Sequence, residues 1–317
     1  FDNASINSKD INKNDIFFAI KGKKHDGRKF TNEAIKRKSS LVITEKVNKN
    51  LPLKKQLIVK DTLNFLTDCA LHYRNNINTS IIGITGSCGK TTLKELLGNS
   101  ISKIATTYFS PKSFNNKYGV PLSILNLKQY KKFGIFEVGM DRKGEIDYLS
   151  KILKPNIGII TNISYAHSKN FKNINGIAEA KSEIINNIKS GGSIILNEDD
   201  KFFNFLKTKA LKKNLKIFSF SLKNKKSYAY LLKVVKINKK FKIYFKVGNK
   251  VDFYYSYNKS KNHIQNLLAT LIVFSLFFEI KKISKYIFLN FKFPEGRGDI
   301  SKLKFKDKII NYVDESY

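Results

Sequence analysis

The chain has 317 residues, of which 42% are hydrophobic and 13% aromatic, which is typical of a folded globular protein with two or more domains. Its two cysteines, Cys69 and Cys88, exclude a disulfide framework and lack metal-ligand spacing, which favours a reducing cytoplasm. The formal net charge is +34, but the lysines are scattered among many Asn, Ile, Phe and Tyr residues, so the charge indicates drift toward AT-rich codons more than a nucleic-acid partner.

The first 78 residues predict a small α/β unit, which we expect to be a separate domain. Strand-like runs lie at 15–22, 40–44 and 56–60, and helical spacing of apolar residues predicts helices at 30–38 and 62–76. The second helix becomes polar toward its end. This predicts a domain boundary near residue 78.

Residues 79–293 alternate strands and helices, the βαβ pattern of a mostly parallel sheet. Strands are expected at 80–85, 134–138, 157–161 and 193–197, and helices at 90–101, 146–153 and 177–188. Residues 231–247 alternate polar and apolar side chains and predict an antiparallel hairpin, and a helix is expected at 263–278. Its apolar run, 267–278, is shorter than the about 20 residues that cross a bilayer, so no membrane insertion is expected.

Residues 294–317 predict the beginning of a third domain, because 308–316 has the pattern of a strand entering a new unit. The chain starts with Phe1 rather than Met and stops on this strand, so we expect it to be incomplete at both ends. The expected fold class is α/β, with a small N-terminal domain and a central phosphate-loop domain with a mostly parallel sheet.

The string "TGSCGKTT" between the strand 80–85 and the helix 90–101 predicts a phosphate-binding loop. Glycines let backbone N–H groups face an anion, and the helix that follows adds its N-terminus. Lys90 is expected to reach the terminal phosphates and Thr91 to hold Mg²⁺. The strict motif has four residues between its first glycine and the Gly-Lys pair, whereas five residues separate Gly83 from Gly89 here, so the strict motif fails. A glycine turn without a ligand is the alternative, and the loop alone indicates only a nucleoside triphosphatase. The candidate nucleotide-binding residues in it are Thr85, Gly86, Ser87, Cys88, Gly89, Lys90, Thr91 and Thr92.

Four further strings follow in order: "SFNNKYGVP" (113–121), "FEVGMDRKGEI" (136–146), "TNISYAHSKNF" (161–171) and "IAEAKSEI" (177–184). Together with the glycine loop they resemble the Mur ligase family over nearly the whole chain. Two of them, "NNxxGVP" and "EVGMxxxGEI", are typical of the branch that adds D-alanyl-D-alanine to UDP-N-acetylmuramoyl-tripeptide, and residues 6–30 look like its uridine-nucleotide-binding domain.

The resemblance implies an ATP-dependent ligase that forms a peptide bond through an acyl phosphate in peptidoglycan precursor synthesis. It implies ATP and two Mg²⁺ ions as cofactors, UDP-N-acetylmuramoyl-tripeptide and D-alanyl-D-alanine as substrates, and a Rossmann-like third domain that delivers the amine. The enzyme is expected to be a cytoplasmic monomer without a nucleic-acid partner. Because most of the third domain is missing here, we expect residues 1–317 alone to be inactive.

The family assigns roles to individual residues of this chain. Thr91 and Glu137 match the ligands of the first Mg²⁺, and His167 matches the histidine of the second. Lys181 matches a lysine carried as a carbamate, which turns an amine into an acid that can hold Mg²⁺. Asn115 and Asn116 match residues near the γ-phosphate and the substrate. The expected catalytic set is Lys90, Asn116, His167 and Lys181.

The remaining assignments concern the two nucleotides. Asn266 matches the family's adenine-contacting asparagine, although the histidine usual four residues earlier is replaced by Asn262, with His263 next to it. Arg297 matches an arginine that reaches the nucleotide, and Glu315 an acid that contacts the ribose. In the first domain, the candidates for the uridine nucleotide are Ser8 and Lys9 near the diphosphate, and His25, Asp26 and Gly27 near the uracil.

Two alternatives to this branch remain. One is a sister ligase, such as the enzyme that adds the third residue or folylpolyglutamate synthase. The other, suggested only by the charge, is a nucleic-acid-binding ATPase.

Overall fold

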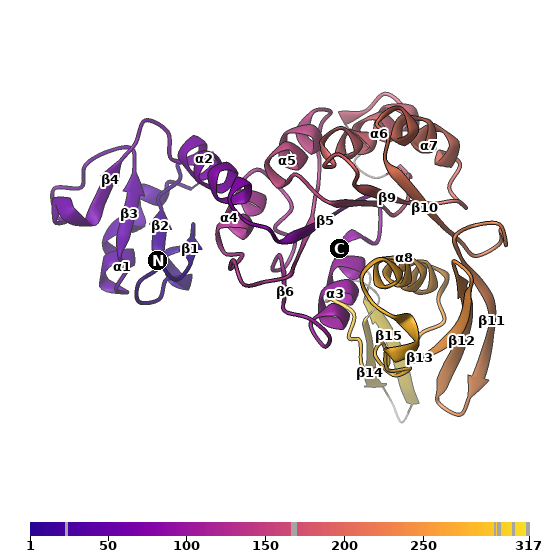
Figure 1. The fold of residues 1–317 in the computed structure, drawn as a ribbon. Coiled ribbons are helices and arrows are strands. Elements are labelled where there is room, and N and C mark those ends of the chain that lie inside the picture. Colours follow the sequence, from indigo (N-terminus) through magenta and orange to yellow (C-terminus); the bar gives the residue numbers. More distant parts are fainter. Residues whose placement is uncertain (23–24, 166–169, 295, 297–298, 306–307, 315–317) are drawn as a thin grey trace.

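The computed structural model describes the chain except for residues 23–24, 166–169, 295, 297–298, 306–307 and 315–317. In the described part the strands form three sheets, of four, nine and two strands. Figure 1 shows the four-stranded sheet at one end of the molecule, joined to the nine-stranded sheet through helix α2 (Thr62–Asn75). The expected α/β fold class is confirmed.

The four-stranded sheet is parallel, with its strands side by side in chain order. It contains β1 (Ala4–Ser5), β2 (Ile16–Phe18), β3 (Leu41–Thr44) and β4 (Gln56–Ile58), together with α1 (Thr31–Lys36) and the 3-10 helices η1 (Ser8–Asp10), η2 (Gly27–Phe30) and η3 (Leu53–Lys55). Neighbouring residues of a strand point to opposite faces. Phe17 and Val42 therefore pack with α1, whereas Phe18 and Ile43 join the core that contains α2.

The nine-stranded sheet has the order β13-β12-β11-β10-β9-β8-β5-β7-β6. Neighbouring strands pair in parallel, except β11 with β12 and β12 with β13. The strands are β5 (Ser80–Thr85), β6 (Thr107–Phe109), β7 (Phe133–Glu137), β8 (Ile157–Ile160), β9 (Ser193–Asn197), β10 (Lys216–Ser221), β11 (Ala229–Ile237), β12 (Lys240–Val247) and β13 (Lys250–Ser256). The expected hairpin is thus confirmed as β11–β12, with Asn238 at φ +52 in its turn.

Helices cover both faces of this sheet (Figure 1). On one face, α2 shares a core with α4 (Gly119–Leu125), α5 (Glu145–Leu153), α6 (Ile174–Ser182), η5 (Glu183–Asn187) and α7 (Phe203–Lys212). On the other face lie α3 (Lys90–Ile101), α8 (Lys261–Phe277) and η6 (Ile280–Lys282). The alternation of strand residues divides the two cores, so Ile81 faces the first layer and Ile82 the second.

Most of the expected elements are present, with ends that differ by a few residues. The helix expected at 177–188 is α-helical only to Ser182 and continues as the 3-10 helix η5. The sequence did not predict β1, β6, α4, α7, β10, β13 or β14. Helix α4 begins with Gly119, Val120 and Pro121, which resemble a turn, but proline is tolerated in the first turn of a helix.

After α8, the chain forms an antiparallel pair of strands, β14 (Asp299–Phe305) and β15 (Lys308–Asp314). This confirms a strand in the segment 308–316. The division into three domains and the Rossmann-like character of the third remain predictions. In the part of the chain that the structure describes, no helix combines the length and the apolar character that a bilayer crossing requires.

Candidate active site

The phosphate loop, residues 86–89, connects β5 to α3 and needs both of its glycines. Gly86 has φ +144 and Gly89 φ +81, conformations that favour glycine. A Cβ atom at Gly86 would lie 2.0 Å from Thr161 Oγ1, so no larger residue fits there. Gly89 caps α3 without a side-chain hydrogen bond, so an anion can approach the first amide groups of the helix.

The segment after β8 holds this loop in place. Thr161 donates from Oγ1 to the Cys88 carbonyl at 2.6 Å, and Asn162 Oδ1 accepts from the Cys88 amide at 3.0 Å. Ser87 uses its hydroxyl to bond the backbone of Ser164. Thr161, Asn162 and Ser164 belong to a string that resembles the family, but His167 was the residue of this string predicted to act in the site. A threonine, an asparagine and a serine directly after a buried strand were the available signal.

Two lysines converge on one backbone carbonyl of the loop. Lys90 Nζ and Lys181 Nζ each lie 2.9 Å from the Gly86 carbonyl oxygen, although the residues are far apart in the sequence. Lys181 is 1% exposed and Lys90 is 9% exposed. Burial, together with the nearby charge of Lys90, lowers the pKa of Lys181 to about 7. Near neutral pH, Lys181 therefore divides between an ammonium and a neutral amine, which is a nucleophile.

A buried carboxylate lies at the end of β7, beside the first turn of α3. Glu137 is 1% exposed and accepts a hydrogen bond from Thr91 Oγ1 at 2.5 Å and another from Asn115 Nδ2 at 2.7 Å. Strands β5 and β7 are parallel neighbours, so the loop after β5 and the end of β7 meet at the same edge of the sheet. The structure thus brings together three of the residues that the sequence singled out.

These groups fit a magnesium ion. A hydroxyl and a carboxylate are hard oxygen donors of the kind that Mg²⁺ prefers, and both are oriented by hydrogen bonds before any metal binds. Lys181 fits only as a carbamate, since an ammonium has no lone pair to donate and a neutral amine lacks the oxygen donor that Mg²⁺ prefers. Within the described residues, no group of three His, Cys, Asp or Glu side chains is arranged for a metal. His167 lies outside the described residues.

A cleft of ≈ 1820 Å³ opens in front of the phosphate loop. Its walls include residues of the predicted site, namely Ser87, Cys88, Gly89, Lys90, Thr92, Asn115, Asn116, Glu137 and Asn266. Residues that were not predicted to belong to the site also line it, among them Met140, Asp141, Arg142, Phe241, Tyr257, Phe291 and Phe293. The Asn266 amide lies next to the loop, 3.6 Å from where a Cβ atom of Gly89 would be. Aromatic rings in the cleft beside the phosphate loop form a suitable surface for a nucleotide base.

Two further predicted residues have structural partners: Asn116, which lines the cleft, and Thr85, which precedes the phosphate loop. Asn116 accepts hydrogen bonds at Oδ1 from the amides of Tyr118 and Gly119, each at 3.0 Å, and so fixes the turn that begins α4. Thr85 is fully buried, and its carbonyl accepts a hydrogen bond from the Thr161 amide.

His263 lines the cleft but is 2% exposed, with Nε2 2.9 Å from Ser256 Oγ. Its Nδ1 has no hydrogen-bond partner among the described residues. Burial lowers its pKa to about 4, so the imidazole is neutral at physiological pH.

The candidates for the uridine nucleotide lie in the four-stranded unit, and none lines the part of the cleft that the structure describes. Ser8 is buried and donates to Glu33 Oε2 at 2.8 Å, whereas Lys9 is exposed. His25 is exposed, and its carbonyl accepts from the Gly22 amide. Gly27 has room only for a hydrogen atom, because a Cβ atom would lie 2.7 Å from the Ile20 carbonyl.

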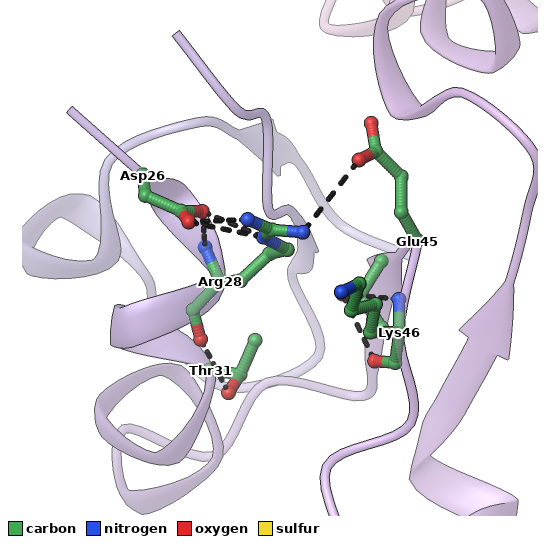
Figure 2. Close-up of polar contacts among 6 residues, drawn as sticks. Asp26, Arg28, Thr31, Glu45 and Lys46 are labelled. Carbon is green, nitrogen blue, oxygen red and sulfur yellow. Dashed lines mark hydrogen bonds and ion pairs between the residues drawn. The ribbon is translucent and has the colours of Figure 1, made fainter. Parts of the chain in front are cut away.

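Asp26 is held by an arginine (Figure 2). The Arg28 guanidinium donates to both oxygens of the Asp26 carboxylate, with its shortest contact at 2.6 Å, and also points toward Glu45 at 4.0 Å. The hydrogen bond from Arg28 lowers the pKa of Asp26 to about 2. Asp26 therefore stays ionised and oriented by its neighbour. Arg297 and Glu315, assigned to the other nucleotide, lie outside the described residues.

Known proteins resemble this arrangement over most of the chain. Residues 84–274 match the family described as Mur ligase middle domain. The UDP-N-acetylmuramoyl-tripeptide–D-alanyl-D-alanine ligase of Buchnera aphidicola (Acyrthosiphon pisum) is 34% identical over 88% of this chain and 61% of its own length. The ligase of the same name from Rickettsia prowazekii is 31% identical over 98% of this chain and 69% of its own length.

The crystal structure of MurF ligase from Thermotoga maritima in complex with ADP superposes with a TM-score of 0.82 and 26% identity. It covers 99% of this chain, which in turn covers 71% of that structure. The chain thus spans about three fifths to seven tenths of the length of these relatives.

Proposed function

Because the chain belongs to the Mur ligase family, we propose that it carries the ATP-binding and acyl-phosphate-forming site of a ligase that adds D-alanyl-D-alanine to UDP-N-acetylmuramoyl-tripeptide. The observation that carries this proposal is the meeting of Lys90 and Lys181 at the Gly86 carbonyl. Two ammonium groups at one carbonyl repel each other. The repulsion is relieved when Lys181 loses its proton, which leaves Lys90 as the cation for the terminal phosphates of ATP.

The neutral amine of Lys181 accounts for a carbamate at this position. Its nitrogen adds to the carbon of CO₂, a proton leaves, and the buried side chain gains a carboxylate-like group. The new oxygens replace a poor metal ligand with a good one. Thr91, Glu137, His167 and this carbamate would hold two Mg²⁺ ions, which neutralise phosphate charge when bound.

The chain's own residues then support a two-step reaction. A carboxylate oxygen of the muramyl peptide bonds to the γ-phosphorus of ATP, and ADP leaves. An amine then attacks the carbonyl carbon of the acyl phosphate, loses a proton, and phosphate leaves. Lys90 and the amides of the phosphate loop stabilise the charge on the transferring group, and Asn115 and Asn116 border the path to the substrate.

The nucleotides occupy two separate regions in this proposal. Asn266 and the aromatic side chains of the cleft receive the adenine, and Arg297 and Glu315 approach the rest of ATP. The four-stranded unit, 1–78, binds the uridine nucleotide through Ser8, Lys9, His25, Asp26 and Gly27. Residues 79–293 form the ATP domain, and 294–317 begin a third, Rossmann-like domain. We place the enzyme in the cytoplasm as a monomer.

An experiment on the acyl phosphate tests the proposal. The protein is incubated with Mg-ATP, UDP-N-acetylmuramoyl-tripeptide and hydroxylamine, which traps an acyl phosphate as a stable hydroxamate. Mass spectrometry should then detect the hydroxamate of the muramyl peptide, and the Lys90→Met variant should not form it. The Lys103→Met variant is the control, because Lys103 bonds a carbonyl far from the loop.

The same assay separates the alternatives. A sister ligase would form a hydroxamate with the muramyl dipeptide or with a folate instead of the tripeptide. An ATPase that acts on nucleic acids would release phosphate with DNA or RNA and form no hydroxamate. Either result would contradict the proposal.

A further inference from the structure

One buried lysine beside the site has no role in the chemistry above. Lys94 follows Thr91 by three residues in α3 and is fully buried. Its Nζ donates to the carbonyl oxygens of Ser110 and Lys112, both at 2.5 Å, and lies 2.9 Å from Glu95 Oε1. A buried ammonium is destabilising unless acceptors compensate for its lost hydration. Here three acceptors do so, and two belong to one short segment.

That segment needs support, because its backbone is strained. Lys112 has φ +47, in the left-handed region where a residue with a Cβ atom is disfavoured by about 1 kcal/mol. The carbonyl of this residue is one of the two that Lys94 holds. The hydrogen bond from Lys94 therefore acts at the strained residue, which lies near the start of the loop between β6 and α4.

The loop carries Asn115 to Glu137. Asn115 donates from Nδ2 to Glu137 Oε1, and its carbonyl accepts from the Gly139 amide at 2.8 Å. A Cβ atom at Gly139 would lie 2.9 Å from Asn115 Cγ, so this side chain packs closely against the backbone after β7. The other oxygen of Glu137 accepts from Thr91. Both carboxylate oxygens are thus oriented, one by α3 directly and one by the loop.

Thr91 and Lys94 stand at i and i+3 of one helix, so they share a face of α3. Thr91 touches Glu137, and Lys94 holds the loop whose Asn115 touches Glu137 from the other side. We propose that Lys94 is a positioning residue, which orients the Glu137 carboxylate for Mg²⁺ by fixing residues 110–112 and, through them, Asn115. This inference rests on the proposed function.

The test compares Lys94→Met, which keeps an unbranched side chain without the charge, with Lys94→Gln, which keeps a donor. Lys103→Met is the matched control, since Lys103 follows the same helix and donates to the Ile287 carbonyl at 2.8 Å. The first measurement is hydrogen exchange of the protein without nucleotide. The backbone amides of residues 110–116 should exchange faster in Lys94→Met than in the parent, and at an intermediate rate in Lys94→Gln. In Lys103→Met they should exchange at the parent rate.

The second measurement is the affinity for ADP with and without Mg²⁺. The gain in affinity that Mg²⁺ brings should fall about tenfold in Lys94→Met, as for other residues that orient metal ligands. The affinity for ADP without Mg²⁺ should stay within about twofold of the parent value, because Lys90 and the phosphate loop are unchanged. Asn115→Ala should give the same loss, and adding it to Lys94→Met should cause little further loss.

The outcomes separate this inference from the proposed function. Unchanged exchange of 110–116 in both Lys94 variants overturns the inference, whatever the protein binds. An equal loss of affinity with and without Mg²⁺ also overturns it, because it indicates general damage. If the parent protein binds no ADP while exchange of 110–116 rises in Lys94→Met, the proposed function and the metal role fail together, and only the anchoring of the loop stands.

Discussion

Single side chains set the chemistry of the phosphate loop. Lys181 and Lys90 meet at one carbonyl, and the proposed function requires a different charge state of each. Lys90 has to remain a cation to bind phosphate. Lys181 has to lose its proton before it can become a metal ligand. The two roles lead to separate predictions.

Replacing Lys90 with Met should weaken ATP binding by about 3 kcal/mol, because the positioned charge at the phosphates is lost. Isothermal titration calorimetry with ADP and with ATP should show the larger loss for ATP, whose γ-phosphate is the group that Lys90 is proposed to reach. Circular dichroism checks that the variant is folded. Equal affinity of parent and variant would remove Lys90 from the site.

Carbamylation of Lys181 should increase with pH through about 7. Its pKa is lowered to that value, so the reactive neutral amine is the minor form below pH 7 and the major form above it. Nuclear magnetic resonance with ¹³C-labelled bicarbonate should show one carbamate signal that grows between pH 6 and 8 and is absent in Lys181→Ala. Acetate should partly restore hydroxamate formation in that variant. A carbamate signal that persists in Lys181→Ala would assign it to another lysine.

His263 should make the folded state sensitive to acid. Its folded pKa is lowered from 6.5 to about 4, so the unfolded chain binds the proton more tightly between these values. The contribution of the neutral His263 to the free energy of unfolding is therefore fully present above pH 6.5. It falls by up to about 3 kcal/mol as the pH drops toward 4. Urea unfolding at a series of pH values gives the free energy of unfolding as a function of pH. This free energy should change less with pH in His263→Gln than in the parent. Equal changes would mean that other groups cause the pH dependence.

At the scale of elements, the close packing of α3 against β6 depends on a glycine. A Cβ atom at Gly98 would lie 2.5 Å from Cγ of the Phe109 ring, a contact that requires the ring or the helix to move. Gly98→Ala should therefore destabilise the protein by about 1–3 kcal/mol, although alanine favours a helix by up to about 1 kcal/mol.

Urea unfolding measures this difference. The control is Asn99→Ala, an exposed position of the same helix, which should change the midpoint little. If Gly98→Ala is as stable as the parent, α3 and β6 are less closely packed than the structure indicates. Because α3 carries Lys90, Thr91 and Lys94, the position of this helix against the sheet also determines where these three side chains lie.

At the scale of the whole molecule, a buried arginine connects α2 to the nine-stranded unit. Arg74 is 1% exposed and donates to the carbonyls of Leu153 and Lys154 at 2.7 and 2.9 Å, before β8, and to Ile77 at 3.3 Å. Tyr73 adds a hydrogen bond to the Leu127 carbonyl. These contacts hold α2 against the nine-stranded unit, and α2 shares a core with the four-stranded unit. The proposed function requires such a fixed arrangement, because its substrate would extend from one unit to the other.

Arg74→Met should destabilise the protein by about 3 kcal/mol, because several buried carbonyls lose their donor. Burial lowers the pKa of Arg74 to about 10, so the arginine stays charged at neutral pH and the loss should not vary between pH 6 and 8. Limited proteolysis should cut the variant faster between α2 and β5, whereas the exposed Arg37→Met serves as the control. A stable and resistant variant would mean that other contacts join the two units.

The features of this protein that have local causes could be predicted from its sequence. The βαβ alternation predicted the parallel sheet and most of its helices. The glycines and Lys90 predicted the phosphate loop, because such a turn and the helix start after it depend on residues a few positions apart. Helix α4 was missed because its first residues, Gly119 and Pro121, also suit a turn. The edge strands β1 and β6 have two and three residues, too few to show an alternating pattern.

Which distant residues come together depends on the three-dimensional fold and could not be predicted from local patterns. Thr91 and Glu137 are 46 residues apart, and Gly86 and Lys181 are 95 apart. They meet because β5 lies between β7 and β8, which places the loops after these strands at one edge of the sheet. The low pKa of Lys181 and the burial of Lys94 and Arg74 likewise come from residues that are close in space but distant in the sequence. In a chain so rich in lysine, only the fold distinguishes a lysine that faces solvent from one that is enclosed with its acceptors.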